Sequence, residues 1–344
     1  VPNIEHDRWL TALERVAGVE RKSKMLRTRF LPRKFEYAKR SAWATPAGYG
    51  VLPQDQQPQR PLPEHVRSRV RAESVLIGKF DVNAEVRLRA FYPKSGVSIR
   101  YQTGGKSNGI TRTVNAHKRV RRYAPGLMPA VHEHGTILDG RGAFLIEDTV
   151  AGETATRAEL EAMIVPVTKR LHAVPQGVGI TDKSASAILG RQYLERWAEF
   201  VELHELDPTL DQKVRSLLQR DDLLEVSLTH GDLVNSNILI DGNNFVLVDW
   251  EWSMHKPIAF DLSKMIINVS NLEQVIEDVQ TGLGDIGTQK SHYTFREQVA
   301  LALVQALTFY KRQFLRAKKA KRTNALARQT GKRVKALSRL LETA

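Results

Sequence analysis

Cysteine is absent from this chain of 344 residues. The sequence therefore has no disulfide framework and no thiolate metal site. No apolar run reaches the roughly 18 residues of a membrane-spanning helix, and the first residues lack the basic and apolar stretches of a secretion signal. These absences predict a cytoplasmic protein without a membrane span. A chain of this length buries a full core and usually forms about two domains.

Acidic residues are scarce at the two ends of the chain. Of the formal net charge of +14, residues 1–40 contribute +6 and residues 311–344 contribute +11, so residues 41–310 sum to −3. Basic ends of this kind can attract a polyanion such as nucleic acid or acidic lipid headgroups. The alternative is a pair of solvated helices with basic outer faces, because the ends carry no nucleic-acid-binding motif.

The most informative stretch spans residues 228–251. It contains the pattern His230-Gly-Asp232-x4-Asn237, followed by two short apolar runs and by Asp249 at the end of the second run. An Asp-x4-Asn pair alone is weak evidence for any function. The same pair followed by a hairpin and a second Asp is far more specific, because it is the order of parts needed for phosphoryl transfer.

The residue types after the motif predict a β-hairpin. Residues 238–240 and 245–248 are apolar or β-branched runs of strand length, and residues 241–244 between them are Asp-Gly-Asn-Asn, which favours a tight turn. The hairpin would bring Asp249 close to the loop that carries the first Asp and the Asn. Such oxygen-bearing side chains suit Mg²⁺, which binds one or two carboxylates together with phosphate oxygens. A polar surface loop with an edge hairpin would not explain the spacing.

These residues resemble a known family. The His-Gly-Asp-x4-Asn motif, the Val-Asp-Trp-Glu sequence at 248–251 and residues 257–262 are similar to the aminoglycoside phosphotransferase and choline kinase-like superfamily. Protein kinases usually carry His-Arg-Asp and Asp-Phe-Gly instead, so the chain resembles the branch that acts on small molecules. The resemblance implies an α+β, two-lobed protein-kinase-like fold, with a small antiparallel β-sheet N-lobe, a mainly helical C-lobe and extra helical basic ends.

The resemblance also implies a role for each matching residue of the loop. Asp232 would be the catalytic residue, which orients the acceptor hydroxyl and takes its proton late. Asn237 and Asp249 would be the Mg²⁺ ligands. His230 would be structural and hold the loop through a hydrogen bond. Asp261 would brace the same loop, and the alternative for Asp261 is an N-cap of the helix that follows it.

On the nucleotide side, Arg100 is expected to take the place of a lysine that normally grips the phosphates. It ends the pattern Val-Ser-Ile-Arg, and its planar guanidinium can bind phosphate oxygens in pairs. The alternative is a solvent-facing arginine on a strand. The usual partner is a Glu on the following helix, but residues 110–125 contain no acid. Either Asn115 or His117 stands in, or the pair is absent.

The apolar run at 143–148 resembles the hinge strand of the family. Backbone groups around Glu147 to Thr149 would then meet the adenine of ATP, and GTP is possible. The turn at 80–83 has no glycine, so either the phosphates are covered in another way or nucleotide binding is weakened.

Composition suggests three regions. Residues 1–68 form a basic helical extension with a helix at 4–27 and a Pro-rich linker at 46–63, residues 69–150 form the N-lobe, and residues 151–344 form the C-lobe with the basic C-terminal helices. Expected strands span 75–80, 84–92, 97–102 and 143–148, and expected helices span 113–123, 156–171, 184–205, 208–219, 262–280, 292–318 and 324–341.

The function implied by the resemblance is an ATP- and Mg²⁺-dependent phosphotransferase that acts on a hydroxyl of a small molecule. The acceptor stays open. Trp250 and Trp252 could suggest a cation–π site for an amino alcohol, but they alternate on a short segment, so one belongs to the core and only one could face a ligand. Glu251 and the acids at 199–207 would suit a cationic aminoglycoside, and a neutral or anionic sugar is equally compatible. Two alternatives are a degenerate kinase-like module that binds nucleotide or a partner, and a kinase tethered to a polyanion through its basic ends.

Overall fold

The computed structural model describes twelve segments of the chain: residues 41–45, 48–51, 75–80, 86–92, 97–103, 109–137, 142–150, 153–174, 182–241, 244–283, 292–319 and 323–342. The helix expected at 4–27, the turn at 81–83 and most of the Pro-rich linker lie outside these segments. Two compact units divide the chain, the first being Val1–Lys118 with Met128–Ala151 and the second Arg119–Leu127 with Gly152–Ala344. In the described segments, no helix has both the length and the apolar character that a membrane crossing requires.

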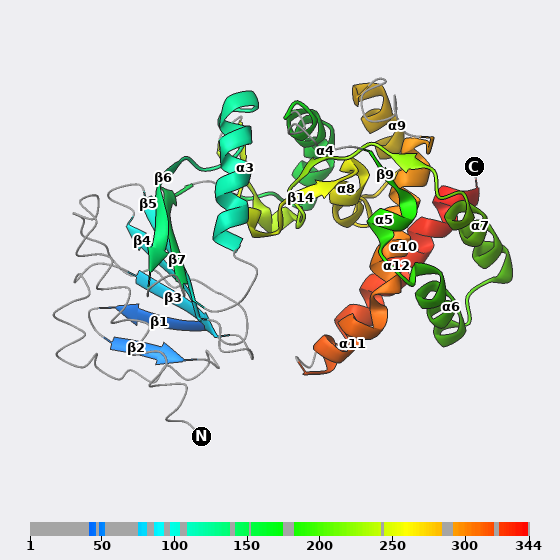
Figure 1. Cartoon of the computed structure of the whole chain (residues 1–344), viewed down its shortest axis with the longest axis horizontal. Helices are drawn as coiled ribbons and strands as arrows, with labels where there is room; N and C mark the ends of the chain where they lie inside the picture. The colour runs from blue at the N-terminus through cyan, green and yellow to red at the C-terminus, as the bar shows by residue number, and fades with distance from the viewer. Residues whose placement is uncertain are drawn as a thin grey trace. The chain divides into compact units, whose positions relative to one another are not determined.

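The first unit is built on a seven-stranded antiparallel sheet with the order β2-β1-β3-β4-β5-β7-β6 (Figure 1). Its strands are β1 (Ser41–Thr45), β2 (Gly48–Val51), β3 (Val75–Phe80), β4 (Val86–Tyr92), β5 (Val97–Thr103), β6 (Val131–Ile137) and β7 (Gly142–Asp148).

All four expected strands are present, as β3, β4, β5 and β7. The sheet also begins earlier than expected. Residues 48–51, which composition placed in a linker, form β2 and pair with β1 in the register Trp43↔Gly50. Strand β6 pairs with β7 around a register shift between Val131 and Glu133. Edge strands with glycine and polar residues carry a weak apolar pattern, which explains why periodicity did not reveal β2 and β6.

Helix α3 (Gly109–Tyr123) covers the first unit's sheet near its β7 strand. Ile110 and Val114 on α3 form a buried cluster with Ala143 and Leu145 of β7. The helix starts four residues before the expected position, because apolar residues one turn apart continue its buried face toward the N-terminus.

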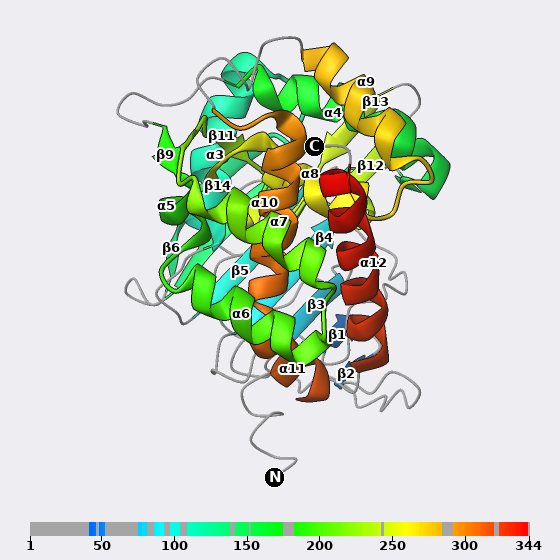
Figure 2. The same cartoon turned by 90° about the vertical axis from the view of Figure 1, so that its right-hand side faces the viewer.

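The second unit is mainly helical (Figure 2). Helix α10 is in contact with α6, α7, α8, α9 and α12. Its residues are buried almost all round, from Phe295 to Thr308, as expected for a helix at the centre of a bundle. The helices are α4 (Arg157–His172), α5 (Ala185–Leu189), α6 (Tyr193–His204), α7 (Pro208–Gln219), α8 (Ile258–Ile266), α9 (Leu272–Leu283), α10 (Phe295–Thr308), α11 (Tyr310–Lys319) and α12 (Thr323–Glu342).

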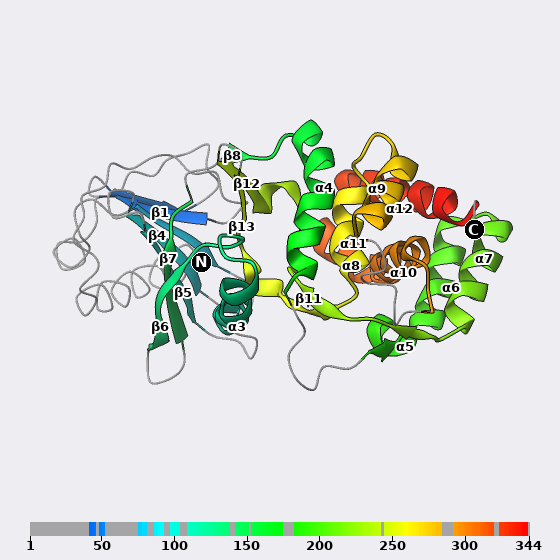
Figure 3. The same ribbon diagram turned by 90° about the horizontal axis from the view of Figure 1, so that it is seen from above.

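Short strands complete the second unit. Figure 3 shows β8, β12 and β13 together, in a three-stranded sheet with the order β13-β12-β8. The hairpin of β12 and β13 has the register Asp241↔Asn244, so the predicted hairpin is confirmed. The strands are β8 (Glu153–Thr154), β9 (Lys183–Ser184), β10 (Leu223–Leu224), β11 (Ser227–Thr229), β12 (Ile238–Asp241), β13 (Asn244–Leu247) and β14 (Met254–Lys256), with 3₁₀ turns η2 (Asn235–Asn237) and η3 (Trp250–Trp252).

Three of the expected helices are each broken in two. The helix expected at 184–205 divides at Gly190, whose φ of +88° belongs to the left-handed region that glycine favours. The helix expected at 262–280 divides between α8 and α9, where the Asn271 side chain accepts a hydrogen bond from Gln274 N at 3.3 Å. The helix expected at 292–318 divides at Phe309, which lies between α10 and α11. In each case a continuous apolar spacing concealed a local break.

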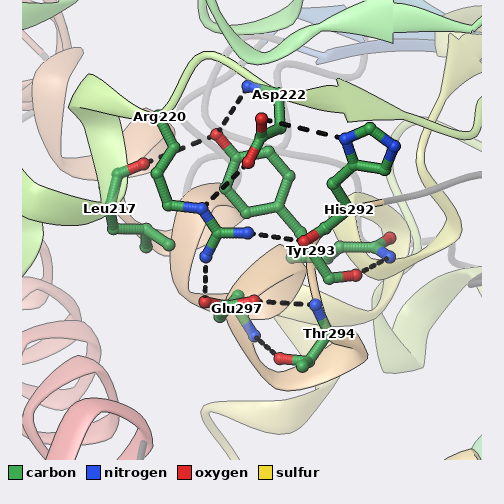
Figure 4. A network of polar contacts seen from close by, with 8 residues as sticks. Leu217, Arg220, Asp222, His292, Tyr293, Thr294 and Glu297 are labelled. Carbon is green, nitrogen blue, oxygen red and sulfur yellow. Dashed lines mark hydrogen bonds and ion pairs between the residues drawn. The ribbon is translucent and has the colours of Figure 1, made fainter.

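Arg220, at the end of α7, ties that helix to the start of α10 (Figure 4). Its Nε donates to Asp222 Oδ2 at 2.9 Å, its Nη1 donates to the Glu297 carboxylate, and its Nη2 donates to the His292 carbonyl at 2.5 Å. The guanidinium also lies over the ring of Tyr293, 4.4 Å from the ring centroid. One side chain thus joins two helices through ionic, polar and cation–π contacts.

Replacing this side chain tests the contribution of the contacts. Arg220→Ala is expected to lower the free energy of unfolding by about 1–2 kcal/mol. The loss is not expected to be larger, because the ion pairs are half-exposed and solvent screens them. Arg215→Ala is the matched control, because Arg215 pairs with Asp211 within α7 itself and is expected to contribute less than about 0.5 kcal/mol. Urea unfolding measures both, and equal losses would show that Arg220 does not join the helices.

The C-terminal helix α12 separates its charges between two environments. Arg328, Lys332, Lys335 and Arg339 are exposed, whereas Arg333 is only 7% exposed among the apolar residues of the inner face. Part of the positive charge counted at this end therefore points into the second unit. A polyanion contact through the outer face of α12 stays a prediction, and residues 1–40 lie outside the described segments.

Candidate functional site

The predicted catalytic loop follows β11 in the second unit and is shaped by Gly231. Gly231 has a φ of +81°, and a Cβ atom placed there would lie 2.0 Å from the Trp252 carbonyl oxygen. Strand β11 pairs with β14 in the register Thr229↔Met254, which holds the chain after Trp252 against the start of the loop. A glycine is required here because the backbone is left-handed and another backbone segment leaves no room for a side chain.

His230 holds the loop from its inner side. The residue is fully buried, its Nε2 contacts the Val248 carbonyl at 2.8 Å, and the Asp232 N–H donates to its Nδ1 at 3.4 Å. These two contacts fit a neutral ring that donates from Nε2 and accepts at Nδ1. The imidazole ring also packs against Trp250, with 4.8 Å between ring centroids. His230 therefore links the loop to the end of β13 and does not act at its surface.

Asp261 braces the loop from α8. Its carboxylate accepts the backbone N–H of His230 at 2.5 Å and that of Gly231 at 2.7 Å. Burial raises the pKa of Asp261, while the two backbone donors and the positive charge of Lys264 act in the opposite direction. The alternative of an N-cap is wrong, because α8 begins at Ile258 with Pro257 in the cap position and Asp261 lies inside its first turn.

Asp232 lies at the exposed end of this braced segment. Its carbonyl accepts a hydrogen bond from Asn237 Nδ2 at 2.8 Å, and its Oδ1 lies 2.5 Å from Lys264 Nζ. About a third of each charged side chain is exposed, so solvent can reach the carboxylate. Lys264 was not singled out from the sequence. The signal that points to it is its position one helical turn after Asp261, which puts both side chains on the same face of α8.

The hairpin brings Asp249 toward Asn237. Ile238 pairs with Leu247, and the Val248 N–H donates to the Asn237 carbonyl at 2.9 Å. Asp249 therefore directly follows the residue whose backbone is hydrogen-bonded to Asn237. Asp249 has a φ of +68°, which non-glycine residues seldom adopt. Backbone of this kind is concentrated at functional sites, where the surrounding structure holds it in place.

The side-chain oxygens of Asn237 and Asp249 are suitable ligands for Mg²⁺. Because Asn237 Nδ2 donates to a carbonyl, the amide oxygen remains as the acceptor that this side chain presents. One amide oxygen and the Asp249 carboxylate suit Mg²⁺, which takes its other ligands from phosphate oxygens and water. The described segments contain no group of three or more His, Asp or Glu that could hold a metal ion by protein ligands alone.

The two tryptophans after Asp249 differ in environment. Trp250 is 1% exposed, and its Nε1 donates to the Leu247 carbonyl at 2.7 Å, so it belongs to the core. Trp252 is 45% exposed. Of the two, only Trp252 could therefore face a ligand, as their alternation predicts. Of the acids at 199–207, Asp207 caps α7 by accepting from Thr209 N at 2.7 Å.

Arg100 lies in the first unit, on β5, and it is not a solvent-facing arginine. Its Nε lies 3.0 Å from Glu147 Oε1, and its Nη2 donates to Glu147 Oε2 at 3.3 Å and to Thr113 Oγ1 at 3.1 Å. Ser98 pairs with Glu147 across the sheet, so Arg100 and Glu147 are diagonal neighbours on one face. The acidic partner of this cation thus comes from β7 and not from α3.

Neither Asn115 nor His117 stands in for the missing acid. Asn115 is exposed, and His117 Nε2 accepts a hydrogen bond from Val131 N at 3.1 Å, which ties α3 to β6.

The predicted adenine contacts lie at the end of β7. This strand pairs with both β5 and β6 as far as Glu147, whereas Thr149 lies beyond the paired residues of the sheet. The Thr149 hydroxyl is buried and has no hydrogen-bond partner among the described residues. Nucleotide contacts by Arg100, Glu147 and Thr149 stay predictions.

Several solved structures are similar to this chain. A thermostable mutant of aminoglycoside phosphotransferase APH(4)-Ia, in a ternary complex with AMP-PNP and hygromycin B, matches with a TM-score of 0.50 and 13% identity over 77% of this chain and 95% of that one. Choline kinase LicA from Streptococcus pneumoniae gives a TM-score of 0.45 and 15% identity over 73% and 89%. A choline/ethanolamine kinase family protein from Mesorhizobium loti gives 0.44 and 14% over 73% and 89%.

The first of these structures, together with the sheet and helices described above, confirms the predicted α+β, two-lobed protein-kinase-like fold. No curated protein sequence matches the chain. The sequence profile of the phosphotransferase enzyme family matches residues 108–293, which is more than half of the chain and includes the whole loop from His230 to Asp249. The resemblance seen in the motif is thereby confirmed, and the chain belongs to the phosphotransferase enzyme family.

Proposed function

We propose that the protein is an ATP-dependent, Mg²⁺-dependent phosphotransferase that transfers the γ-phosphate to a hydroxyl of a small molecule. The observation that carries the proposal is the braced loop, in which buried His230 and Asp261 fix the backbone so that Asp232 is presented at the surface beside Asn237. Family membership supports the same reaction class. The proposal covers acceptors of the sugar, amino alcohol and aminoglycoside types, and GTP is an alternative donor.

Each residue of the loop has one task in the proposed reaction. The acceptor oxygen forms a bond to the γ-phosphorus, the bond from that phosphorus to the β–γ bridging oxygen breaks, and ADP leaves. Asp232 orients the acceptor hydroxyl and takes its proton as the new bond forms. Asn237 and Asp249 would hold Mg²⁺, which when bound offsets the phosphate charge. Arg100 would add a further positive charge toward the phosphates.

The proposal is tested by thermal unfolding with ATP or GTP, each with and without Mg²⁺. The wild-type protein is expected to be stabilised by the nucleotide with Mg²⁺, by about 2.7 kcal/mol at a hundredfold excess over Kd. Asp249→Ala is expected to lose most of the Mg²⁺-dependent part, because the only carboxylate among the proposed ligands is removed. Asp278→Ala is the control, since this exposed residue on α9 accepts a hydrogen bond from Gln274 of the same helix and is not among the proposed ligands.

The outcomes separate the proposal from its alternatives. Stabilisation that requires Mg²⁺ and is lost only in Asp249→Ala would support the assigned site and justify screening of alcohols as acceptors. Absence of stabilisation by either nucleotide would overturn the proposal in favour of a degenerate kinase-like interaction module. A cytoplasmic location and a contact between the basic ends and a polyanion stay predictions that this experiment does not address.

A further inference from the structure

A cavity of about 210 Å³ lies within the second unit, next to the catalytic loop. Gly231 of the loop forms part of its wall, and residues of β11, β14, α8, α10, α11 and α12 also line it. It is smaller than the roughly 300–1,000 Å³ of pockets that enclose a drug-sized ligand. A cavity of this size suits a small compound or one polar group of a larger compound.

Three positively charged side chains line this cavity. Lys264 comes from α8, Lys256 from β14 and Arg333 from α12, so residues far apart in the sequence converge on one space. Lys264 connects the cavity to the catalytic residue, because its Nζ lies 2.5 Å from Asp232 Oδ1. Arg333 is 7% exposed and Lys256 is half-buried.

Two of the three cations have only neutral partners. Arg333 Nη1 donates to Gln313 Oε1 at 3.3 Å, and Lys256 Nζ donates to Gln305 Oε1 at 2.8 Å. Within the described segments, neither cation forms an ion pair with a carboxylate. A glutamine oxygen satisfies a hydrogen bond but does not neutralise a charge. Burial of an unpaired cation is costly, so these two positions call for an anion.

One acid also lines the cavity, but it is already engaged. Both carboxylate oxygens of Asp261 accept backbone N–H groups of the catalytic loop. Burial lowers the pKa of Lys256, the negative charge of Asp261 opposes this effect, and the positive charges of Lys264 and Lys183 add to it. Burial alone lowers the pKa of Arg333. The positive charge in the cavity is therefore only partly offset by the protein.

We propose that this cavity binds an anionic group, a carboxylate or a phosphate, on the alcohol that accepts the phosphoryl group. The inference rests on the proposed function, and it specifies the substrate class. Arg333 contacts the anionic group as the principal recognition residue, with Lys256 beside it, and Lys264 lies between this group and Asp232. Cationic acceptors such as amino alcohols or aminoglycosides do not suit a cavity of this charge.

The inference is tested first by binding without nucleotide. Glycerol 3-phosphate and glycerate serve as anionic probes, and glycerol and ethanolamine serve as the neutral and cationic probes of similar size. Isothermal titration and thermal unfolding of the wild-type protein are expected to show binding of one or both anions and none of the other two. Whichever anion binds more tightly identifies the group as phosphate or carboxylate.

Substitutions then assign the binding to the cavity. Arg333→Gln is expected to weaken anion binding at least about tenfold, because a charge-assisted hydrogen bond is lost. Arg328→Gln is the matched control, since Arg328 lies on the exposed side of the same helix. Without a ligand, Arg333→Gln is expected to unfold at the same temperature as the wild type or at a higher one, because an unpaired buried charge is removed. An arginine with a purely structural role would give the opposite shift.

The possible failures are distinguishable. Equal binding of glycerol and glycerol 3-phosphate, or equal anion binding in Arg333→Gln and Arg328→Gln, would overturn the anion site. If the wild type phosphorylates only neutral or cationic alcohols, the anion site is also overturned while the proposed function stands. If anions bind through Arg333 but no alcohol is phosphorylated, the proposed function fails and with it the assignment of the anion as part of an acceptor.

Discussion

Asp232→Asn is expected to lower kcat/KM for phosphoryl transfer to an alcohol by at least about 10²-fold while the protein remains folded. Asparagine has the size of aspartate, and the backbone of residue 232 is held without the carboxylate. Its N–H donates to His230 Nδ1 and its carbonyl accepts from Asn237 Nδ2. The change therefore removes the group that takes the proton and orients the hydroxyl, and it leaves the shape of the loop intact. Release of ADP with whichever alcohol the wild type phosphorylates measures the effect.

The loss of an ion pair must be separated from the loss of a catalytic group, because Asp232 also pairs with Lys264. Glu273→Gln provides the control, since Glu273 pairs with Arg296 at the surface between α9 and α10. Both variants are expected to melt within a few degrees of the wild type, because part-exposed pairs contribute less than about 1 kcal/mol. Only Asp232→Asn is expected to lose activity. Activity within threefold of the wild type in Asp232→Asn would remove this residue from the proposed reaction.

The loop and its hairpin could be predicted because their signals are local. Asp232 and Asn237 are five residues apart, the turn residues lie between two apolar runs, and Asp249 ends the second run. The spacing of these residues and the chemistry of the turn determine the loop and the hairpin without contributions from distant parts of the sequence. The strands β3, β5 and β7 were visible for the same reason, because β3 and β7 are compact apolar runs and β5 alternates apolar with polar residues. Neither pattern depends on the partner strands.

The contacts that escaped prediction are made between distant segments. Arg100 and Glu147 are 47 residues apart and meet because β5 and β7 are neighbours in the sheet, which no local pattern shows. Arg333 was counted among the charges of a basic end, although it lies on the inner face of α12 and lines the cavity beside the loop. Charge counts along a sequence give the sign of an end of the chain, but the direction of each side chain depends on helix packing.

Gly231→Ala is expected to be the most damaging small substitution in the loop. The added Cβ would lie 2.0 Å from the Trp252 carbonyl oxygen, and the Gly231 N–H is held by Asp261 Oδ1 at 2.7 Å. The backbone therefore cannot move away without losing the brace. A left-handed φ alone costs an alanine about 1–2 kcal/mol. The free energy of unfolding of Gly231→Ala is expected to fall by more than this amount, because the steric clash is added. Activity is expected to fall about 10²-fold, because a displacement near 1 Å misaligns Asp232.

Gly190→Ala separates the two contributions. Gly190 has a φ of +88°, close to that of Gly231, but a Cβ atom there would meet no other atom within 4 Å. This control is expected to lose only the conformational term, about 1–3 kcal/mol at its φ of +88° and ψ of 164°, and to keep full activity, because it lies at the end of α5 and outside the loop. Urea unfolding and ADP release are measured for both variants. The difference between them isolates the steric requirement of the loop, and equal losses in the two proteins would show that the Trp252 carbonyl does not confine Gly231.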